Sequence, residues 1–385
     1  MQIENFISGS YSNQKGFKSF TPININTAWN WMNPEINVLM EQASRELGGL
    51  NSFSGLLPNI DVYIQMHIRT EANKSSKIEG TKTSIEEDLM NVEDIAPDKR
   101  DDHEEVRNYI DAMNYGINRI LTDDFPLTTR LMRDIHRVLM RGVRGEHKTP
   151  GEFRTSQNWI GGTMPSNAIF VPPCVNDMNE LLSDLEKFIH NDEDKVPQLI
   201  KIALIHYQFE TIHPFQDGNG RVGRLIIPLY LLDKKILGKP CFYISDFFEK
   251  NRTAYYDALQ NVRTKNDLTG WIIFFLRAVI HTAKSAKYKF ENVVKLVDDY
   301  EEHILTFSGK PDNNRNILKL FFNEPILSSK QLQDRITLSK TTINKVIRRM
   351  VEEKMLYEAT GYNRNRVFIL TEYLNVFARD FSEEA

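Results

Sequence analysis

Residues 213–224, with the sequence HPFQDGNGRVGR, place a histidine and a carboxylate beside a glycine-rich turn. The imidazole of His213 has an unperturbed pKa near neutrality, so it can take up or release a proton at physiological pH. The carboxylate of Asp217 offers the hard oxygen ligands that magnesium prefers. The turn that follows consists of Gly218, Asn219 and Gly220. These residue types predict proton transfer beside a magnesium ion and a bound phosphate.

Two apolar segments must hold this turn in place. Apolar residues recur at spacings of three and four on both sides of it, at Leu199, Ile202, Ala203, Phe209, Ile212, Val222, Leu225, Ile226 and Leu229. This periodicity predicts two core helices that are joined by the turn. Free N–H groups at the start of the second helix, together with the helix dipole, would attract phosphate oxygens.

Two arginines stand in the first turns of the second predicted helix. Arg221 and Arg224 lie three residues apart and therefore share one face of that helix. Cations at a helix N-terminus oppose the helix dipole, which makes their placement unfavourable in the absence of a ligand. A polyanion bound above the two arginines would remove this penalty, so the pair favours a polyanionic ligand.

Residues 213–224 resemble the signature of the Fic family, HPFx[D/E]GNGRxxR, with every specified position filled. The resemblance implies a helical core that transfers AMP from Mg-ATP to a hydroxyl side chain of a target protein. It implies that His213 is the base for the attacking hydroxyl and that Asp217 holds magnesium. It further implies that the glycine-rich turn cradles the α- and β-phosphates, while Arg221 and Arg224 pair with the β- and γ-phosphates. The alternative is a structural turn with a capped loop histidine.

A second short segment, SSKIEG at residues 75–80, ends a helix that the apolar pattern predicts from about residue 60. A carboxylate at a helix C-terminus is unfavourable with respect to the dipole, so Glu79 would benefit from a cationic partner. The segment resembles [S/T]xxxE[G/N], the motif of Fic proteins with an N-terminal inhibitory helix, in which Ser75 and Glu79 are the specified positions. The resemblance implies a salt bridge from Glu79 to Arg224 that occupies the arginine needed by the γ-phosphate. An ordinary exposed helix end is the alternative.

Two further segments complete the predicted site. The β-prone runs within residues 151–173 flank a segment rich in Gly, Pro, Ser and Asn, which predicts a β-hairpin. In the Fic family the corresponding hairpin is a flap that docks the backbone of the target. Residues 247–259 resemble the family's helix that closes the nucleotide pocket, which places Asn251 and either Tyr255 or Tyr256 on the adenine side. The tyrosines could equally be core residues.

Outside the motifs, the sequence predicts helices and connections of ordinary kind. Residues 1–25 are expected to form a loosely held polar arm, and a helix from Glu35 is expected to end at Gly48-Gly49. Residues 91–104 are charged and aperiodic, so they are expected to form a surface connection. His136 lies among apolar residues and is expected to be a core histidine. A helix through residues 271–279 and a long helix toward Leu305 follow.

The last part of the chain is distinct. Three predicted helices are followed by two β-prone runs at residues 355–359 and 366–370, which together resemble a winged helix. The third of these helices carries a polar and basic set that suits groove reading, namely Lys340, Thr341, Thr342, Asn344, Lys345, Arg348 and Arg349. Modules of this kind also serve as protein-docking or dimer surfaces. DNA binding, protein binding and formation of a homodimer therefore all remain open.

The composition sets the remaining limits. The chain has 385 residues, enough for two or three domains, and its hydrophobic content of 41% is ordinary for a soluble globular protein. A net charge of −4 argues against a chain dominated by nucleic-acid binding. Two cysteines provide no disulfide framework and favour a reducing compartment. Because no signal peptide or membrane-length apolar run is evident, we expect a cytoplasmic protein without a membrane partner.

These observations predict a mainly α protein with a Fic-type helical core, a small β-hairpin flap and a C-terminal winged helix-turn-helix domain. The expected divisions are an N-terminal helical region with the inhibitory helix (1–120), the Fic catalytic core (121–283), and a linker helix with the winged-helix domain (284–385). The predicted function is transfer of AMP from Mg-ATP to a Ser, Thr or Tyr hydroxyl of a protein target, restrained by Glu79. The alternatives are a Fic-fold enzyme that transfers another phosphate-containing group or removes AMP, and a DNA-binding regulator with a nucleotide-sensing Fic domain.

Overall fold

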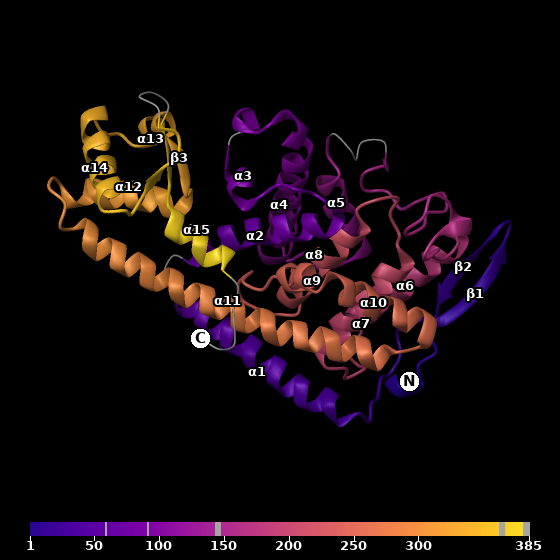
Figure 1. Cartoon of the computed structure of the whole chain (residues 1–385). Coiled ribbons are helices and arrows are strands. Elements are labelled where there is room, and N and C mark those ends of the chain that lie inside the picture. The colour runs from indigo at the N-terminus through magenta and orange to yellow at the C-terminus, as the bar shows by residue number, and fades with distance from the viewer. Residues whose placement is uncertain (58–59, 91, 143–147, 362–365, 380–385) are drawn as a thin grey trace.

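The structure is a computed structural model that describes the whole chain except residues 58–59, 91, 143–147, 362–365 and 380–385. Helices dominate it, and the strands form two small antiparallel sheets (Figure 1). The predicted mainly α class is therefore confirmed. Among the described residues, no helix is both long enough and apolar enough to cross a membrane.

The predicted pair of core helices lies at the centre of the molecule. These are α7 (Gln198–Ile212) and α8 (Asn219–Asp233), in which nearly every residue is buried. A helix that is apolar around its whole circumference must be covered on all sides. The covering helices include α4 (Arg100–Leu121), α5 (Thr129–Leu139), α6 (Val175–His190), α10 (Arg252–Lys265) and α11 (Leu268–Ile304). The loop that joins these two helices is thus held by the buried centre of the fold.

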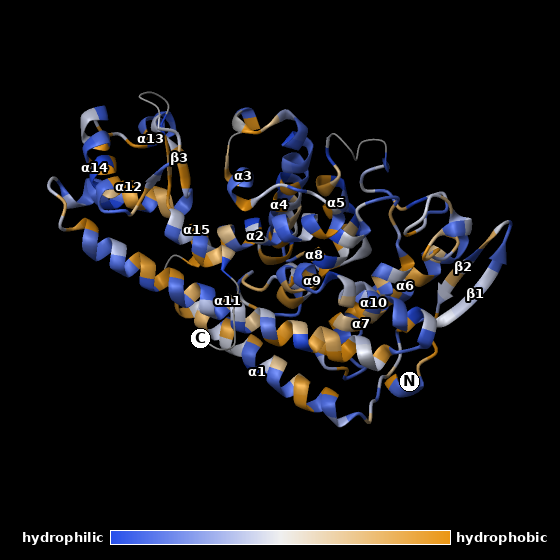
Figure 2. Cartoon of the chain, in the orientation of Figure 1, coloured by the Kyte–Doolittle hydropathy of each residue, from blue (hydrophilic) through white to orange (hydrophobic). Residues whose placement is uncertain are grey.

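Helix α11 is a single element, where the sequence predicted two. It runs continuously from Leu268 to Ile304 and links the core to the C-terminal module. Helix α1 (Pro34–Leu56) packs along it, and both helices carry hydrophobic and hydrophilic residues, as Figure 2 shows. The continuity of α11 crosses the expected domain boundary at residues 283–284, so the three-part division of the chain stays a proposal.

The expected end of α1 at Gly48-Gly49 is wrong, since the helix continues to Leu56. A glycine costs only about 1 kcal/mol relative to alanine in a helix interior. Burial of Leu50 and Ser54 beyond the glycines offsets that cost, because these residues lie on the inward face of the helix. The N-terminus follows the usual rules, with the Asn33 side chain accepting a hydrogen bond from the Glu35 N–H.

The prediction of a loosely held N-terminal arm is also wrong. Residues Gly9–Gln14 (β1) and Phe17–Pro22 (β2) form an antiparallel hairpin, preceded by a short 3-10 helix at Ile3–Asn5 (η1). Phe20 is fully buried, and its N–H donates to the Val171 carbonyl at 2.9 Å. The few apolar residues of this polar segment therefore anchor it to the core.

Residues 91–104 are more regular than expected. Two 3-10 turns, Val92–Asp94 (η2) and Pro97–Lys99 (η3), lead into α4, which already begins at Arg100. One acidic residue of the segment is used internally, since the buried Asp102 carboxylate accepts the Lys82 N–H at 2.9 Å, whereas Glu93 and Asp98 are exposed. Before this segment lie α2 (Ile60–Glu79) and the short α3 (Ile85–Leu89).

The C-terminal module comprises residues 311–378, of which 362–365 lie outside the described residues. Its elements in chain order are α12 (Pro311–Asn323), β3 (Ile326–Ser328), α13 (Ser329–Arg335), α14 (Lys340–Glu352), β4 (Tyr357–Glu358), β5 (Val367–Ile369) and α15 (Thr371–Ala378). The three strands pair antiparallel in the order β3-β5-β4. The predicted helices are present, while β3 and α15 were not foreseen. This element order supports the winged-helix interpretation, which stays a prediction.

Candidate active site

The loop between α7 and α8 is held in an unusual backbone conformation. His213 follows the last residue of α7 with φ 51° and ψ 59°, in the left-handed region. Such a conformation is unfavourable for a side-chain-bearing residue and needs support from its surroundings. The support comes from Arg154 and Asn158, whose Nε and Nδ2 donate to the His213 carbonyl at 3.0 and 3.1 Å. The chain therefore turns sharply and presents the imidazole at the start of the loop.

The glycine-rich turn is closed by its own asparagine. The Asn219 amide donates to the Phe215 carbonyl and accepts the Phe215 N–H, both at 2.8 Å. Gly218 has φ 76°, a conformation that glycine adopts at least cost. Because both polar atoms of the Asn219 side chain form hydrogen bonds within the loop, this side chain stabilises the turn.

The side chain of His136, on α5, supports the turn from below. Its Nδ1 accepts the Gly151 N–H at 2.8 Å, so its Nε2 carries the proton and donates to the Asp217 carbonyl at 3.1 Å. The ring also stacks on Phe215, with centroids 3.8 Å apart and planes 8° apart. Burial lowers the pKa of His136 to about 4, so the imidazole stays neutral. The predicted core role of His136 agrees with these contacts.

A pocket of about 380 Å³ opens beside this turn. Its walls include the predicted site residues Glu79, His213, Asp217, Gly218, Asn219, Gly220 and Arg221. The loop motif and the end of α2, which are far apart in the sequence, thus meet at one cavity. Helix α4 contributes the opposite wall, including Glu105, whose Oε2 accepts a hydrogen bond from Arg221 Nη1 at 3.1 Å.

Arg224 lies one turn further along α8 and is almost fully buried, with 1% of its side chain exposed. All of its hydrogen-bond partners come from the end of α2. Its Nε donates to Ser75 Oγ at 2.8 Å, and its Nη2 donates to the Ser75 carbonyl at 3.0 Å and to Glu79 Oε1 at 2.6 Å. Burial opposes ionisation of Glu79, but Arg224 outweighs it and holds the pKa of this carboxyl below its usual range.

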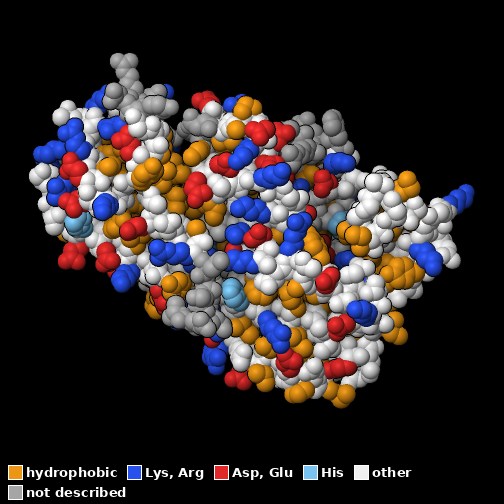
Figure 3. Space-filling model, viewed as in Figure 1, with side chains coloured by type: hydrophobic (Ala, Val, Ile, Leu, Met, Phe, Trp, Pro, Cys, Tyr) orange, Lys and Arg blue, Asp and Glu red, His pale blue; other side chains and the backbone are white. Residues whose placement is uncertain are grey.

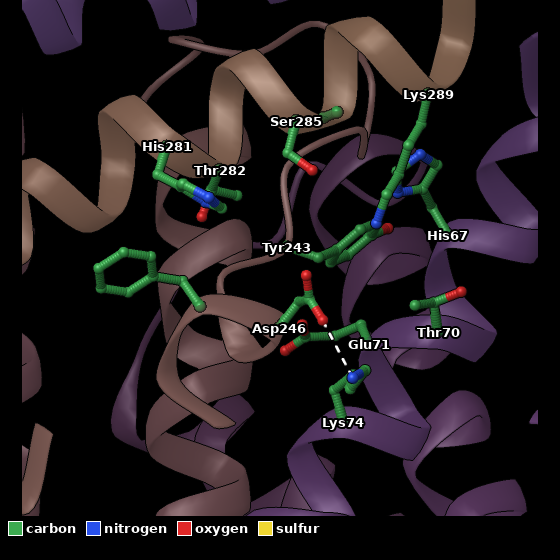
Figure 4. A pocket seen from close by; sticks show the side chains of 12 residues that line it. His67, Thr70, Glu71, Lys74, Tyr243, Asp246, His281, Thr282, Ser285 and Lys289 are labelled. Atoms are coloured by element: carbon green, nitrogen blue, oxygen red, sulfur yellow. Dashed lines mark ion pairs between the residues drawn. The ribbon is translucent and has the colours of Figure 1, made fainter. Parts of the chain in front are cut away.

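Helix α2 is fixed on its other side by α9 (Ser245–Lys250) and α11, as Figure 4 shows. Lys74 Nζ lies 3.1 Å from Asp246 Oδ1 and 3.2 Å from Glu249 Oε2. The buried Glu71 accepts hydrogen bonds from Ser245, through the backbone N–H at 3.0 Å and the hydroxyl at 2.5 Å. These contacts fix the position of the helix end that reaches Arg224.

Comparison with family models supplies the decisive observation. The model "Fic/DOC family N-terminal" matches residues 38–118, and the model "Fic/DOC family" matches residues 126–231, which contain the whole loop described above. The chain is a Fic-domain protein.

Curated relatives carry the same domain. The chain is 33% identical over 177 residues to a protein adenylyltransferase Fic of Aedes aegypti, a match covering 45% of this chain and 32% of that protein. It is 29% identical over 175 residues to the protein of the same name from Drosophila melanogaster, with the same coverage. The chain therefore spans about a third of the length of the curated relatives that it matches.

Solved structures of Fic proteins share the fold. A Fic family protein from Desulfovibrio desulfuricans G20 superposes with a TM-score of 0.54 at 20% identity, covering 90% of this chain and 98% of that one. Fic-1 from C. elegans superposes with a TM-score of 0.52 at 19% identity, covering 68% and 75% of the two chains. The predicted Fic-type helical core is confirmed by these similarities.

The imidazole of the Fic loop, His213, is partly buried and lines the pocket. Burial lowers its pKa to about 4, and the positive charges of Arg263 and Arg154 act in the same direction. Its Nδ1 is enclosed without a partner at ordinary hydrogen-bond geometry within the described part of the chain, and the backbone carbonyl of Glu210 nearby favours protonation of the ring. Nε2 is therefore the nitrogen that can reach a substrate, and in the neutral ring it can accept a proton in the tautomer whose hydrogen lies on Nδ1.

The segment predicted to form a β-hairpin has less regular pairing than expected. Within the described residues 151–173 there is no strand, and pairing is limited to one antiparallel bridge between Ile160 and Phe170. A 3-10 turn at Pro165–Asn167 (η5) lies between the two bridged residues. Proline and glycine in this segment interrupt a ladder, because proline has no N–H and glycine weakens a strand. Trp159 next to the bridge lines the pocket.

The residues predicted for the adenine side are not brought to the pocket beside the loop. Asn251 lies just before α10 as its N-cap residue, and its Nδ2 donates to the Phe247 carbonyl at 2.9 Å. Tyr255 is buried and its hydroxyl bonds His206 Nε2 at 2.8 Å, whereas Tyr256 is 40% exposed. Tyr255 thus has the contacts of a core residue, and a nucleotide role for Asn251 stays a prediction.

The donor set of the site fits a magnesium ion that is shared with phosphates. Asp217 lines the pocket and keeps 48% of its side chain exposed. Among the described residues, no cluster of three or more His, Cys, Asp or Glu side chains could form a metal site by itself. Magnesium bound to nucleotides commonly takes one or two carboxylates and fills its other positions with phosphate oxygens and water.

Sequence reasoning missed Arg154 and Asn158 as supports of the catalytic loop, and Glu105 as the partner of Arg221. Arg154 is 2% exposed, and its guanidinium donates to several backbone carbonyls, among them Pro173 at 2.6 Å. An arginine in a segment of β-prone and turn residues gave no signal of burial. The contacts to the His213 carbonyl join residues 59 and 55 positions apart, and the contact of Glu105 with Arg221 spans 116 positions, so spacing within one element could not reveal them.

A buried histidine on α2 should make the stability of the protein depend on pH. His67 stacks near Phe290 and Phe377, with centroids 4.5 and 5.1 Å away, and burial lowers its pKa to about 3. Below an unfolded-state pKa of about 6.5, only the unfolded chain binds a proton there, so the free energy of unfolding falls with decreasing pH. His67→Phe should reduce this slope by about 1.4 kcal/mol per pH unit between about pH 4 and 6.

Urea unfolding of the parent and the variant across this pH range measures the difference. The exposed His190 offers a matched control, because His190→Phe should leave the slope unchanged. Equal slopes for the parent and His67→Phe would show that His67 takes up its proton in the folded state.

Proposed function

We propose that this chain is a protein adenylyltransferase that transfers AMP from Mg-ATP to a Ser, Thr or Tyr hydroxyl of a target protein. The observation that carries the proposal is the meeting of His213, the glycine-rich turn and Arg221 at one pocket. The names of the relatives from Aedes aegypti and Drosophila melanogaster support it. A cytoplasmic location and a homodimeric state remain further parts of the proposal.

The chemistry follows from the contacts of the loop. The neutral imidazole of His213 accepts the proton of the target hydroxyl while the hydroxyl oxygen attacks the α-phosphorus of ATP. The new oxygen–phosphorus bond forms, the bond to the bridging oxygen breaks, and pyrophosphate leaves with the electron pair. Backbone N–H groups of the turn and the guanidinium of Arg221 stabilise the charge on the phosphate oxygens.

Asp217 would hold the magnesium ion, which would supply positive charge to the phosphate oxygens. The Asp217 carboxylate now accepts the Gly218 N–H at 2.6 Å through Oδ1. The second oxygen, Oδ2, could therefore hold the metal while Oδ1 keeps this local hydrogen bond. The partial exposure of this side chain gives a metal ion access to it.

The end of α2 acts in this proposal as the restraint. Glu79 occupies Arg224, and Ser75 adds hydrogen bonds to the same guanidinium. A γ-phosphate would need Arg224 and would also meet the negative charge of Glu79. Nucleotide binding in the productive position therefore requires that the helix end moves or that the ion pair breaks.

The experiment that tests the reaction uses the Glu79→Gly variant with ATP labelled at either the α- or the γ-phosphate. We expect covalent labelling of protein from the α-labelled nucleotide alone, because AMP carries that phosphorus. Label from γ-labelled ATP would indicate phosphoryl transfer, the alternative chemistry on the same fold. Loss of AMP from a modified target on addition of the unmutated chain would support removal as a second activity.

A DNA-binding role of the C-terminal module is a second candidate, supported by the exposed face of α14. Lys340, Thr341, Lys345 and Arg348 are exposed on this helix, as is Arg349, which also forms an ion pair with Glu353. Figure 3 shows Lys and Arg side chains of this module interspersed with Asp and Glu. The mixture weakens the electrostatic attraction to phosphates that a purely basic face would have.

We expect any duplex DNA binding by the full chain to fall steeply with salt, because phosphate contacts release counterions. The double variant Lys345→Glu/Arg348→Glu should abolish it, while Lys287→Glu on α11 serves as a charge-reversal control outside the module. Fluorescence anisotropy at low and moderate salt measures the effect. Absence of binding at low salt would dismiss this role.

A further inference from the structure

Arg221 keeps N–H donors that are not used within the described residues, whereas Arg224 donates three hydrogen bonds to the end of α2. Arg221 is 6% exposed and lines the pocket beside the glycine-rich turn. Its Nη1 donates to Glu105 Oε2 at 3.1 Å, and its Nη2 lies 3.8 Å from Met140 Sδ. Its Nε has no hydrogen-bond partner within the part of the chain that the structure describes. The guanidinium therefore keeps donors to spare, on a buried group that faces a cavity.

Glu105 approaches Arg221 from α4, whereas the partners of Arg224 come from α2. A guanidinium has five N–H donors, and Glu105 uses one of them at hydrogen-bond distance. Arg224, by contrast, donates three times to Ser75 and Glu79. Glu105 thus compensates the charge of Arg221 without saturating it.

Asp217 could compete with Glu105 for the Arg221 guanidinium. The carboxylate of Asp217 is 4.0 Å from Arg221 Nη2, a distance that a small rotation of the guanidinium would close. A buried arginine at the positive end of a helix dipole needs a counter-charge. Without Glu105, Arg221 could pair with Asp217, which lies in the loop just before the helix, and that ion pair would occupy the group that fits magnesium.

We propose that Glu105 is a positioning residue for nucleotide binding, which holds the Arg221 guanidinium over the phosphate site and keeps it from pairing with Asp217. The inference rests on the proposed function, since it assigns a role in binding the β- and γ-phosphates of ATP. It predicts a selective effect. Nucleotides that carry these phosphates depend on Glu105, and AMP, which lacks them, does not.

The test measures binding by calorimetry in the Glu79→Gly background, where Arg224 is released. With magnesium and a non-hydrolysable ATP analogue, Glu105→Gln should weaken affinity about tenfold, the lower end of what loss of a supporting contact usually causes. The affinity for AMP should stay within about twofold of the parent, because no β- or γ-phosphate is present. Asp111→Asn is the matched control, since that exposed carboxylate lies on the same helix α4 but is not among the residues that line the pocket.

Further measurements distinguish a role of Glu105 in nucleotide binding from misfolding of the variants and from failure of the proposed function. Glu105→Asp, which keeps the charge, should restore part of the lost affinity, and thermal unfolding should confirm that all variants are folded. Equal affinity of Glu105→Gln and the Glu79→Gly parent for the ATP analogue would overturn the role of Glu105 alone. Tighter binding would overturn it as well, because Glu105 would then be a competitor of the phosphates. A parent that binds no ATP analogue would contradict the proposed function and this inference together.

Discussion

Replacing Glu79 by glycine is expected to raise the rate of AMP transfer by about ten- to a hundredfold at subsaturating ATP, because a charge-assisted hydrogen bond contributes about 1.5–3 kcal/mol. The variant frees Nη2 of Arg224, which donates to Glu79 Oε1 at 2.6 Å in the parent. It also removes a negative charge from the wall of the phosphate pocket. The rate of self-labelling with α-labelled ATP and magnesium measures the effect.

A glycine in the last turn of α2 also weakens the helix, so a matched substitution is needed. Lys77 lies in the same turn, and Lys77→Gly should leave the rate near that of the parent. An equal increase in both variants would assign the effect to helix fraying and not to Arg224. Unchanged activity together with unchanged ATP affinity in Glu79→Gly would contradict the proposed restraint.

Replacing His213 by alanine in the Glu79→Gly background is expected to lower AMP transfer by about 10²- to 10⁴-fold, the range typical of a lost general base. Binding of the ATP analogue should be retained, because the turn and the arginines remain. The exposed His190 provides the control, and His190→Ala should transfer AMP at the parent rate. Single-turnover labelling separates this effect from changes in binding.

The pKa of His213 also predicts how the rate of AMP transfer depends on pH. Burial lowers that pKa to about 4, so the base is neutral throughout the physiological range. The rate of AMP transfer should therefore not fall between about pH 8 and 6 through protonation of His213. A loss of rate with a midpoint near the ordinary histidine pKa of about 6.5 would show that the imidazole is solvated in the working state.

The part of the site that lies within one continuous stretch could be predicted from the sequence. The turn after His213 is specified locally, because Asn219 bonds Phe215 only four residues away and Gly218 has a positive φ. The two flanking helices follow from apolar periodicity. The expected contact of Glu79 with Arg224 came from a resemblance, since 145 residues separate them in the chain.

Features that depend on tertiary partners could not be predicted in this way. The N-terminal segment looks polar, and it is ordered because Phe20 fits against the Val171 backbone. Helix α1 passes through Gly48-Gly49 because packing on α11 overrides local propensity. Arg154 is a charged residue by type, and only the fold reveals it as a buried support of the His213 carbonyl.

A crystal structure of the Glu79→Gly variant with magnesium and a non-hydrolysable ATP analogue tests the central claim most directly. The predicted result is a nucleotide whose phosphate oxygens accept hydrogen bonds from the N–H groups of the glycine-rich turn, with Arg224 on the γ-phosphate. The α-phosphorus should then lie open to attack from the side of His213. A nucleotide bound elsewhere, or bound with its α-phosphorus out of reach of that imidazole, would contradict the account.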